Sequence, residues 1–224
     1  MIKADIIINK KGRYYMSQKP SQSIEQVWIV CHGYGQLAEY FLKWFNPIFS
    51  KKILIIAPEG LHRFYVNGFS GRVGASWMTK QDRLNDIEDY VGYLNDLIFK
   101  IKPSLSSTCF IHVLGFSQGV ATAIRWLCKS DLKVDSLSLF SGKIPEDIDY
   151  QFYAKKINKL NPKILFGNKD EFYSSKAINN ELEFIKDNGL HFKFIEFDGA
   201  HKIEKSIINH LGMIIDEEIN IKNK

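Results

Sequence analysis

The sequence lacks the features that would assign it to a membrane or to a secretory route. No segment approaches the run of about 18 apolar residues that a membrane-spanning helix needs. The N-terminal residues contain no uninterrupted apolar run of the signal-peptide kind, because Asp5 interrupts it, and no Asn-x-Ser/Thr glycosylation acceptor occurs anywhere. We therefore expect a cytoplasmic protein with no integral membrane association.

Cysteine is scarce, with 3 residues in 224. An odd number argues against a disulfide framework, and Cys31 and Cys109 lie in apolar runs where thiols behave as small buried hydrophobic groups. The histidines and cysteines show neither the His-Glu-x-x-His nor the paired Cys-x-x-Cys spacing of metal sites. The sequence thus predicts no metal site.

The composition contains no strong charge imbalance and no low-complexity linker. Hydrophobic residues make up 45% and charged residues 25% of the chain, and the net charge of +5 is spread along it apart from a short Lys-rich C-terminus. We find no nucleic-acid-binding motif and no internal repeat. The chain is expected to form one domain, residues 1–224, without a nucleic-acid partner, and its oligomeric state stays open.

Short apolar runs alternate with longer amphipathic ones along most of the chain, as in βαβ units. The expected strands are residues 6–9, 13–16, 27–31, 53–57, 109–115, 134–140, 163–166 and 192–197. The first two should form an antiparallel hairpin around Lys10-Lys11-Gly12. Apolar residues at helical spacing predict helices over 82–101, over 175–188 and from 202 onward. The pattern predicts an α/β fold with a mostly parallel sheet of about eight strands and helices on both faces.

The most informative segment is residues 115–119, Gly-Phe-Ser-Gln-Gly. It follows a predicted strand and precedes helix-forming residues. In a strand–turn–helix of this kind the serine, here Ser117, is exposed at the turn, and the flanking glycines are needed because the chain passes too close to itself for side chains. A serine hydroxyl requires a neighbouring base to act as a nucleophile at neutral pH.

Two later loops supply an acid and a base in the order typical of this arrangement. Asp170 follows the strand predicted at 163–166, and His201 follows the strand predicted at 192–197. The order Ser, Asp, His, each after a different strand, is that of the α/β-hydrolase triad. We predict that Ser117, Asp170 and His201 are catalytic.

Other acids and histidines are alternatives for the same roles. Asp147 follows the preceding strand, and Asp198 stands just before the histidine. Of the other histidines, His32 is expected to be structural and His112 to be a core residue with its hydrogen bonds satisfied. His62 is expected at the surface and His210 within the last helix.

An oxyanion site is predicted from the loop at 32–35, His-Gly-Tyr-Gly, directly after the strand at 27–31. Acyl transfer passes through a tetrahedral intermediate whose oxyanion needs backbone N–H donors. In this fold one donor comes from this loop and one from the residue after the nucleophile. The expected donors are the backbone N–H groups of Tyr34 and Gln118.

At these positions the chain resembles the phospholipase/carboxylesterase family of α/β-hydrolases, which includes the acyl-protein thioesterases. The shared positions are the segments 32–35, 75–77, 115–119 and 141–142 together with Asp170 and His201. The resemblance implies the α/β-hydrolase fold, the triad and the oxyanion donors named above. Family members often have aspartate where this chain has Gln36 and a second glycine where it has Val120, and neither position is expected to carry chemistry.

The substrate is less well defined than the reaction. Six aromatic residues are candidates for an acyl-binding groove, although they serve equally well as core of a long loop: Phe64, Tyr65, Phe69, Trp77, Phe172 and Tyr173. Only 22 residues separate the strand ending at Phe140 from the strand starting at Lys163, too few for a cap domain. We expect an open site.

The sequence therefore predicts a serine hydrolase that uses no cofactor and cleaves small-molecule esters or thioesters of small to medium acyl chains through an acyl-enzyme. A peptide or amide hydrolase with the same triad is the alternative within the enzymes. A non-catalytic binding protein with this fold is the alternative outside them.

Overall fold

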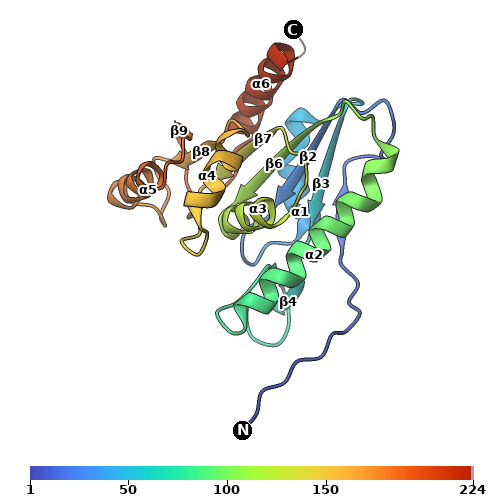
Figure 1. Ribbon diagram of the computed structural model, residues 1–224, viewed down its shortest axis with the longest axis vertical. Coiled ribbons are helices and arrows are strands. Elements are labelled where there is room, and N and C mark those ends of the chain that lie inside the picture. Colours follow the sequence, from blue (N-terminus) through green and yellow to red (C-terminus); the bar gives the residue numbers. More distant parts are fainter. Residues whose placement is uncertain (223–224) are drawn as a thin grey trace.

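The computed structural model describes residues 1–222, and its centre is a seven-stranded sheet in the order β1-β3-β2-β6-β7-β8-β9 (Figure 1). The strands are β1 (Tyr14–Met16), β2 (Gln26–Cys31), β3 (Ile53–Pro58), β6 (Phe110–Phe116), β7 (Ser136–Phe140), β8 (Lys163–Gly167) and β9 (Lys193–Phe197). β1 pairs with β3 antiparallel, and every other neighbouring pair is parallel. The predicted mostly parallel sheet is confirmed.

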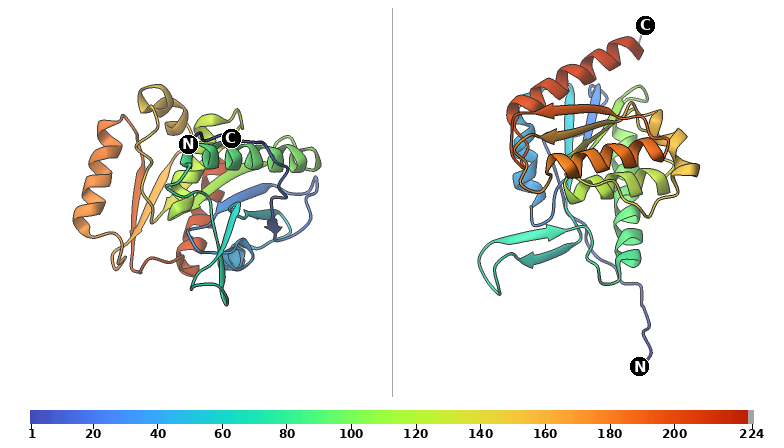
Figure 2. Two further views of the ribbon diagram at one scale, coloured as in Figure 1. Left: turned by 90° about the horizontal axis from the view of Figure 1, so that it is seen from below. Right: turned by 90° about the vertical axis from the view of Figure 1, so that its left-hand side faces the viewer.

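The sheet has one strand fewer than expected because the N-terminal hairpin does not form. Residues 6–9 adopt no strand, and the side chains of Ile6, Ile7 and Ile8 are exposed. β1 pairs with β3 instead, and the segment before it runs away from the body of the molecule (Figure 2). Strand propensity alone is insufficient where no face of a sheet covers the side chains.

Helices cover both faces of the sheet (Figure 2). They are α1 (Ala38–Leu42), α2 (Arg83–Ile101), α3 (Gln118–Lys129), α4 (Tyr150–Asn158), α5 (Ser175–Asp187) and α6 (Lys205–Lys222), with the 3₁₀ turns η1 (Lys43–Ile48) and η2 (Lys102–Ser104). Buried side chains of α2, α3, α4 and α5 pack together on one face, and those of α1, η1 and α6 pack on the other. None of the helices within residues 1–222 is both long enough and apolar enough to cross a bilayer.

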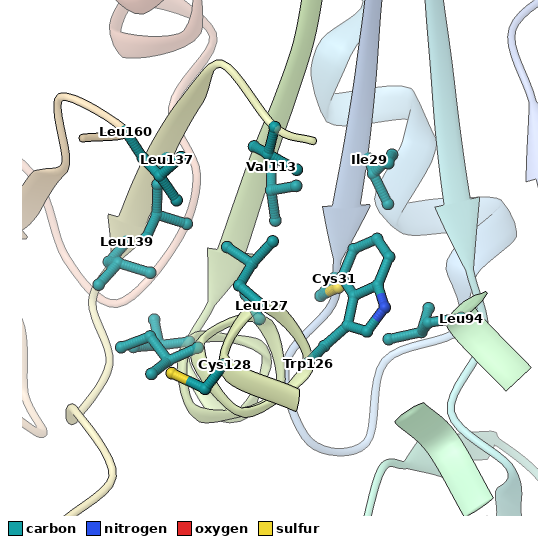
Figure 3. Packing of buried hydrophobic residues seen from close by; sticks show 14 of the residues in the cluster. Ile29, Cys31, Leu94, Val113, Trp126, Leu127, Cys128, Leu137, Leu139 and Leu160 are labelled. Atoms are coloured by element: carbon teal, nitrogen blue, oxygen red, sulfur yellow. The ribbon is translucent and has the colours of Figure 1, made fainter. Parts of the chain in front are cut away.

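The core consists of two layers that share the central strands. In β2, Val27, Ile29 and Cys31 face the layer with α2 and α3, whereas Trp28 and Val30 face the layer with α6. Figure 3 shows the first layer, in which strand side chains pack against side chains of α2 and α3. Successive side chains of a strand point to opposite faces, so a central strand covered on both sides is apolar along most of its length. This pattern explains why the central strands were predictable.

Two features of the connections position the site. The stretch between β3 and α2, expected as a loop, forms an antiparallel hairpin of β4 (His62–Tyr65) and β5 (Val73–Ser76) that projects from the body (Figure 2). Residues 141–162 hold a loop and α4 only. The predicted absence of a cap domain is thus confirmed for this connection, and the carboxyl ends of the parallel strands stay uncovered there.

Candidate active site

Ser117 occupies a tight turn between β6 and α3. Its backbone angles, φ 52° and ψ −116°, lie in a region that non-glycine residues rarely adopt. A Cβ on Gly115 would lie 2.3 Å from the carbonyl oxygen of Gly119, and a Cβ on Gly119 would lie 2.1 Å from that of Cys31. Both glycines are therefore required by close approach of the backbone, and the turn places Ser117 at the carboxyl end of the sheet.

The three residues predicted as a triad lie in one hydrogen-bonded chain. His201 Nε2 is 3.0 Å from Ser117 Oγ, and His201 Nδ1 is 2.9 Å from Asp170 Oδ2. The Asp170 side chain has no exposed surface, and its Oδ1 also accepts the N–H of Phe172 at 2.9 Å. A buried carboxylate at Nδ1 favours the tautomer with its proton there, which leaves Nε2 free to accept the serine proton.

Aromatic rings enclose the histidine. The ring centroids of Phe172 and Phe116 lie 4.7 Å and 5.1 Å from that of His201, and Tyr173 stacks on it at 6.2 Å. Phe172 and Tyr173, predicted as substrate-binding residues, thus contact the histidine itself. The Phe172 side chain stays largely exposed.

The alternative acids are engaged elsewhere. Asp147 accepts hydrogen bonds from the Arg125 guanidinium, the shortest at 2.7 Å. Burial raises the pKa of Asp147, but the hydrogen bonds and charge of Arg125 outweigh it and hold that pKa below its usual value. Asp198 is exposed and pairs with Lys169 at 2.6 Å. Neither carboxylate contacts His201.

The loop of residues 33–36 holds its N–H groups in fixed directions. Gly33 N–H donates to Gln36 Oε1 at 2.8 Å, Gly35 N–H donates to Ala75 O at 2.9 Å, and Gln36 N–H donates to Gly33 O. Within residues 1–222, the N–H of Tyr34 has no such acceptor, and neither has the N–H of Gln118 at the start of α3. These are the two N–H groups expected to bind an oxyanion.

The side chains of Gln36 and Gln118 hold segments of the site in place, a role that was not predicted from the sequence. Gln36 stands where the family often has aspartate, and it holds the loop through Gly33. The Gln118 side chain accepts the N–H of Trp77 at 3.1 Å and donates to Met78 O at 3.0 Å. In the sequence, only the position of Gln36, three residues after Gly33 on a tight loop, indicated this role.

Trp77 differs from its expected place in a substrate groove. Its side chain is completely buried, and its indole N–H donates to His32 O at 2.8 Å. The ring packs against His32 at 5.1 Å and against Tyr90 at 6.0 Å. Trp77 is therefore a core residue that supports the loop of residues 32–35, and it has no surface to offer a substrate.

The two buried histidines have different surroundings. His32 has the structural role expected of it: Nδ1–H donates to Gly33 O, Nε2 accepts the N–H of Gly60 at 2.9 Å, and burial lowers its pKa to about 4. His112 is also buried, but within residues 1–222 neither ring nitrogen has a hydrogen-bond partner, contrary to the expectation of satisfied bonds. It packs on Trp28, and burial followed by the charge of Lys163 lowers its pKa well below the usual value.

The remaining aromatic candidates lie on the hairpin and do not form one wall with the others. Phe64 stacks on the ring of Tyr34 at 5.0 Å. Tyr65 is exposed on β4, and Phe69, in the turn between β4 and β5, is 97% exposed. Among residues 1–222, no group of three or more His, Cys, Asp or Glu side chains is placed to hold a metal ion.

A parallel sheet with a strained serine at a strand–helix turn, and with Asp and His after later strands, defines an α/β-hydrolase. The chain belongs to the phospholipase/carboxylesterase family, whose model matches residues 14–218. The predicted resemblance is confirmed, and by this membership the protein is a carboxylic-ester hydrolase.

Solved structures agree with this fold at low sequence identity. Acyl-protein thioesterase 2 of Zea mays is 14% identical, with a TM-score of 0.68 over 93% of this chain and 100% of that one. Esterase PE8 is 19% identical, with a TM-score of 0.65 over 93% and 99%. A carboxylesterase of Bacillus cereus is 13% identical, with a TM-score of 0.64 over 94% and 96%. No curated protein sequence matches the chain.

Proposed function

We propose that the protein is a serine esterase or thioesterase in which Ser117 is the nucleophile, His201 the general base and acid, and Asp170 the residue that orients the histidine. The observation that carries this proposal is the unbroken hydrogen-bonded chain from Ser117 Oγ through the imidazole to a fully buried carboxylate. Its distances of 2.9–3.0 Å are those required for proton transfer between positioned groups.

The first half-reaction forms an acyl-enzyme. Ser117 Oγ attacks the carbonyl carbon while His201 Nε2 takes the hydroxyl proton, and the N–H groups of Tyr34 and Gln118 bind the resulting oxyanion. The intermediate collapses when the C–O or C–S bond to the leaving group breaks and Nε2 returns the proton to that group. Asp170 stabilises the imidazolium that exists between the two proton transfers.

The second half-reaction releases the acid. Water attacks the acyl carbon, Nε2 removes its proton, and the same oxyanion donors serve again. Ser117 leaves with the proton, which regenerates the resting state. Within residues 1–222 no cap lies between β7 and β8, so we propose substrates with small to medium acyl chains that enter from solvent. We propose acyl contacts with Phe172 and Tyr173 beside His201, and separate contacts with Phe64, Tyr65 and Phe69 on the hairpin. The Zea mays neighbour is an acyl-protein thioesterase, which favours testing thioesters as well.

A fluorophosphonate probe tests the nucleophile. We expect one label per chain, located on Ser117 by mass spectrometry, and no label on Ser117→Ala. The matched control is Ser141→Ala, because Ser141 is also a serine after a central strand but its hydroxyl is buried without a protein partner in residues 1–222. It should keep its label. Labelling that persists in Ser117→Ala would contradict the proposal.

A matched substrate set tests the reaction class. Nitrophenyl butyrate and a butyryl thioester should be hydrolysed by the wild type and not by Ser117→Ala. Butyryl nitroanilide should react at least 10³-fold more slowly than the ester. Comparable turnover of the anilide would favour the amide-hydrolase alternative, and labelling without any turnover would favour the binding protein.

A further inference from the structure

A second feature of the site lies beside the proposed oxyanion donors. A cavity of about 790 Å³ has Tyr34 and Gln118 in its lining. Its other walls come from residues 78–80 and Arg83 at the start of α2, from the first turns of α3, and from the loop 143–147 between β7 and α4. Figure 1 shows α2, α3 and α4 on the same side of the sheet. The proposed mechanism uses only the Tyr34 and Gln118 edge of this cavity.

The cavity is lined by more positive than negative side chains. Its cations are Lys80, Arg83, Arg125 and Lys143, and its anions are Glu146 and Asp147, which leaves a formal charge of +2. The molecule as a whole carries +5 on 224 residues, so this is a local concentration of positive charge. Positive charge on the walls of a cleft raises the local concentration of anionic molecules.

The centre of this charge is a buried arginine. The Arg125 side chain is only 5% exposed, and its Nε and Nη2 donate to Asp147. Its Nη1 lies 3.6 Å from the sulfur of Met78, which is a weak partner, and the Tyr90 side chain also lies close to the guanidinium. An arginine buried on α3, eight residues after the nucleophile, has donor capacity beyond what Asp147 accepts.

A second arginine shares the same carboxylate. Arg83 Nη2 lies 3.0 Å from Asp147 Oδ2, so two guanidinium groups are neutralised by one acid. Arg83 Nε is buried, and within residues 1–222 it has no hydrogen-bond partner. Lys143 is paired with Glu146, whereas Lys80 adds a further cation to the rim. Guanidinium groups with unused donors bind carboxylates and phosphates well.

Met78, Ala121, Ile144 and Pro145 also line the cavity and make most of its exposed surface apolar, but a purely aliphatic acyl chain is a poor occupant beside its charged groups. It would displace water from the guanidinium and ammonium groups without replacing their hydrogen bonds, and that desolvation is unfavourable. A group with acceptor oxygens and a negative charge would replace the lost water and balance the excess charge. The observations therefore favour an anionic occupant.

We propose that the cavity formed by Lys80, Arg83, Arg125 and Lys143 is a subsite for a carboxylate or phosphate group of the substrate. The inference rests on the proposed function, because the same Ser117 would cleave the ester. It adds that preferred substrates carry a negative charge a few bonds from the scissile carbonyl, on either the acyl or the leaving-group side.

Two matched substrate pairs distinguish a charge on the acyl side from a charge on the leaving-group side. The nitrophenyl monoester of glutarate and nitrophenyl valerate have the same chain length, but only the first has a charged acyl end. Valeryl glycerol 3-phosphate and valeryl glycerol differ in charge on the leaving group. We expect at least one charged substrate to exceed its neutral match about tenfold in kcat/KM at low salt, and the ratio to fall as salt increases.

Arg83→Gln tests the subsite directly. The charged-to-neutral ratio of kcat/KM should fall at least fivefold in this variant, whereas a purely structural defect would lower both values together. Lys129→Gln is the matched control, because Lys129 is an exposed cation on α3 outside the cavity, and it should keep the wild-type ratio.

Two results would overturn the inference: charged-to-neutral ratios at or below one for both pairs, or a ratio that survives Arg83→Gln unchanged. In either case, neutral esters hydrolysed through Ser117 would leave the proposed function intact. Ester hydrolysis that survives Ser117→Ala would instead overturn the proposed function. Isothermal titration of Ser117→Ala with glutarate and glycerol 3-phosphate gives a readout that needs no turnover. We expect binding of the ligand that corresponds to the preferred charged substrate, and weaker binding when Arg83→Gln is added.

Discussion

The backbone of Ser117 has unfavourable angles, a conformation that costs about 1–3 kcal/mol and persists only where the surroundings enforce it. Here the surroundings are Gly115, Gly119 and the end of β2 at Cys31, which pack so closely that no Cβ fits. Because the hydroxyl cannot relax into the helix, it stays directed at His201. The strain is thus part of how the proposed nucleophile is held in place.

At the scale of single residues, Asp170→Asn should reduce kcat by roughly 10³–10⁴-fold. The amide is the same size, but it has no charge to stabilise the imidazolium and does not enforce the proton on Nδ1. Ester turnover and circular dichroism together give the measurement, since the fold should be retained. Asp198→Asn is the matched control on the loop before His201, where the acid only pairs with Lys169 at the surface. A large loss in Asp198→Asn, with Asp170→Asn active, would show that the acid is wrongly assigned.

Residues that follow a predicted strand could be placed from the sequence, because parallel strands deliver their next residues to one edge of the sheet. This is how Ser117, Asp170 and His201 were found. Trp77 and Gln36 could not be placed in this way. Whether an aromatic ring lines a groove or fills the core depends on what packs against it, and nothing in the sequence indicated that His32 and Tyr90 pack against Trp77.

At the scale of elements, the hairpin of β4 and β5 holds the loop of residues 33–36, which carries a proposed oxyanion donor. Ala75 on β5 accepts the N–H of Gly35 at 2.9 Å and donates to Gln36 O at 3.1 Å, so the loop is attached to the edge of the hairpin. β5 approaches so closely that a Cβ on Gly74 would lie 2.6 Å from Gly35 O. The direction of the Tyr34 N–H therefore depends on an element outside the main sheet.

Gly74→Ala should separate the hairpin from the loop and reduce kcat by about 10²-fold, the scale of losing one oxyanion donor. The melting temperature should change little, because the hairpin contributes little to either core layer. Steady-state kinetics with a neutral ester and a thermal melt test this expectation. Gly92→Ala is the control, because a Cβ there on α2 has open space and alanine favours the helix. Full activity in Gly74→Ala would show that the hairpin does not position the donor.

The elements that the sequence predicted well are those covered on both faces. β2, β3 and β6 are buried along almost all of their length, and apart from Gln26 and His112 their residues form the apolar runs that predict buried strands. The predictions that were wrong or missing concern chain at the margin of the sheet. Residues 6–9 have strand-like composition but no covering layer, and β4 alternates between half-buried and exposed residues in a pattern too short to recognise.

At the scale of the whole molecule, the sheet separates two apolar layers. Each layer encloses polar groups for which the charged form is unfavourable. His32 and His112 are both fully buried and both have a lowered pKa. Lys163 lies under α6, where it pairs with Glu218 at 2.6 Å, so the surroundings of His112 already contain a cation. The folded protein is therefore built to keep these two imidazoles neutral.

This arrangement makes stability depend on pH in a known direction. A histidine whose pKa is lower in the folded than in the unfolded chain binds more protons when unfolded, so its contribution is fully present above about pH 6.5 and is lost as the pH falls towards the folded pKa. His32, with a folded pKa of about 4, loses its contribution between about pH 6.5 and 4. His112 adds a loss in the same direction as the pH falls, because its pKa is lowered well below 6.5.

His112→Phe should remove the contribution of His112 to this pH dependence of stability. The ring packs on Trp28 and makes no hydrogen bond within residues 1–222, so an apolar ring should be tolerated, with unchanged or greater stability at pH 7.5. Between pH 7.5 and 5 the variant should lose less free energy of unfolding than the wild type, by up to about 2 kcal/mol, which is the cost of 1.5 pH units below the unfolded pKa for a ring that stays neutral in the fold. Urea unfolding at both pH values measures it. His210→Gln, exposed on α6, should keep the wild-type dependence, and equal slopes for His112→Phe and wild type would show that His112 becomes protonated within the fold.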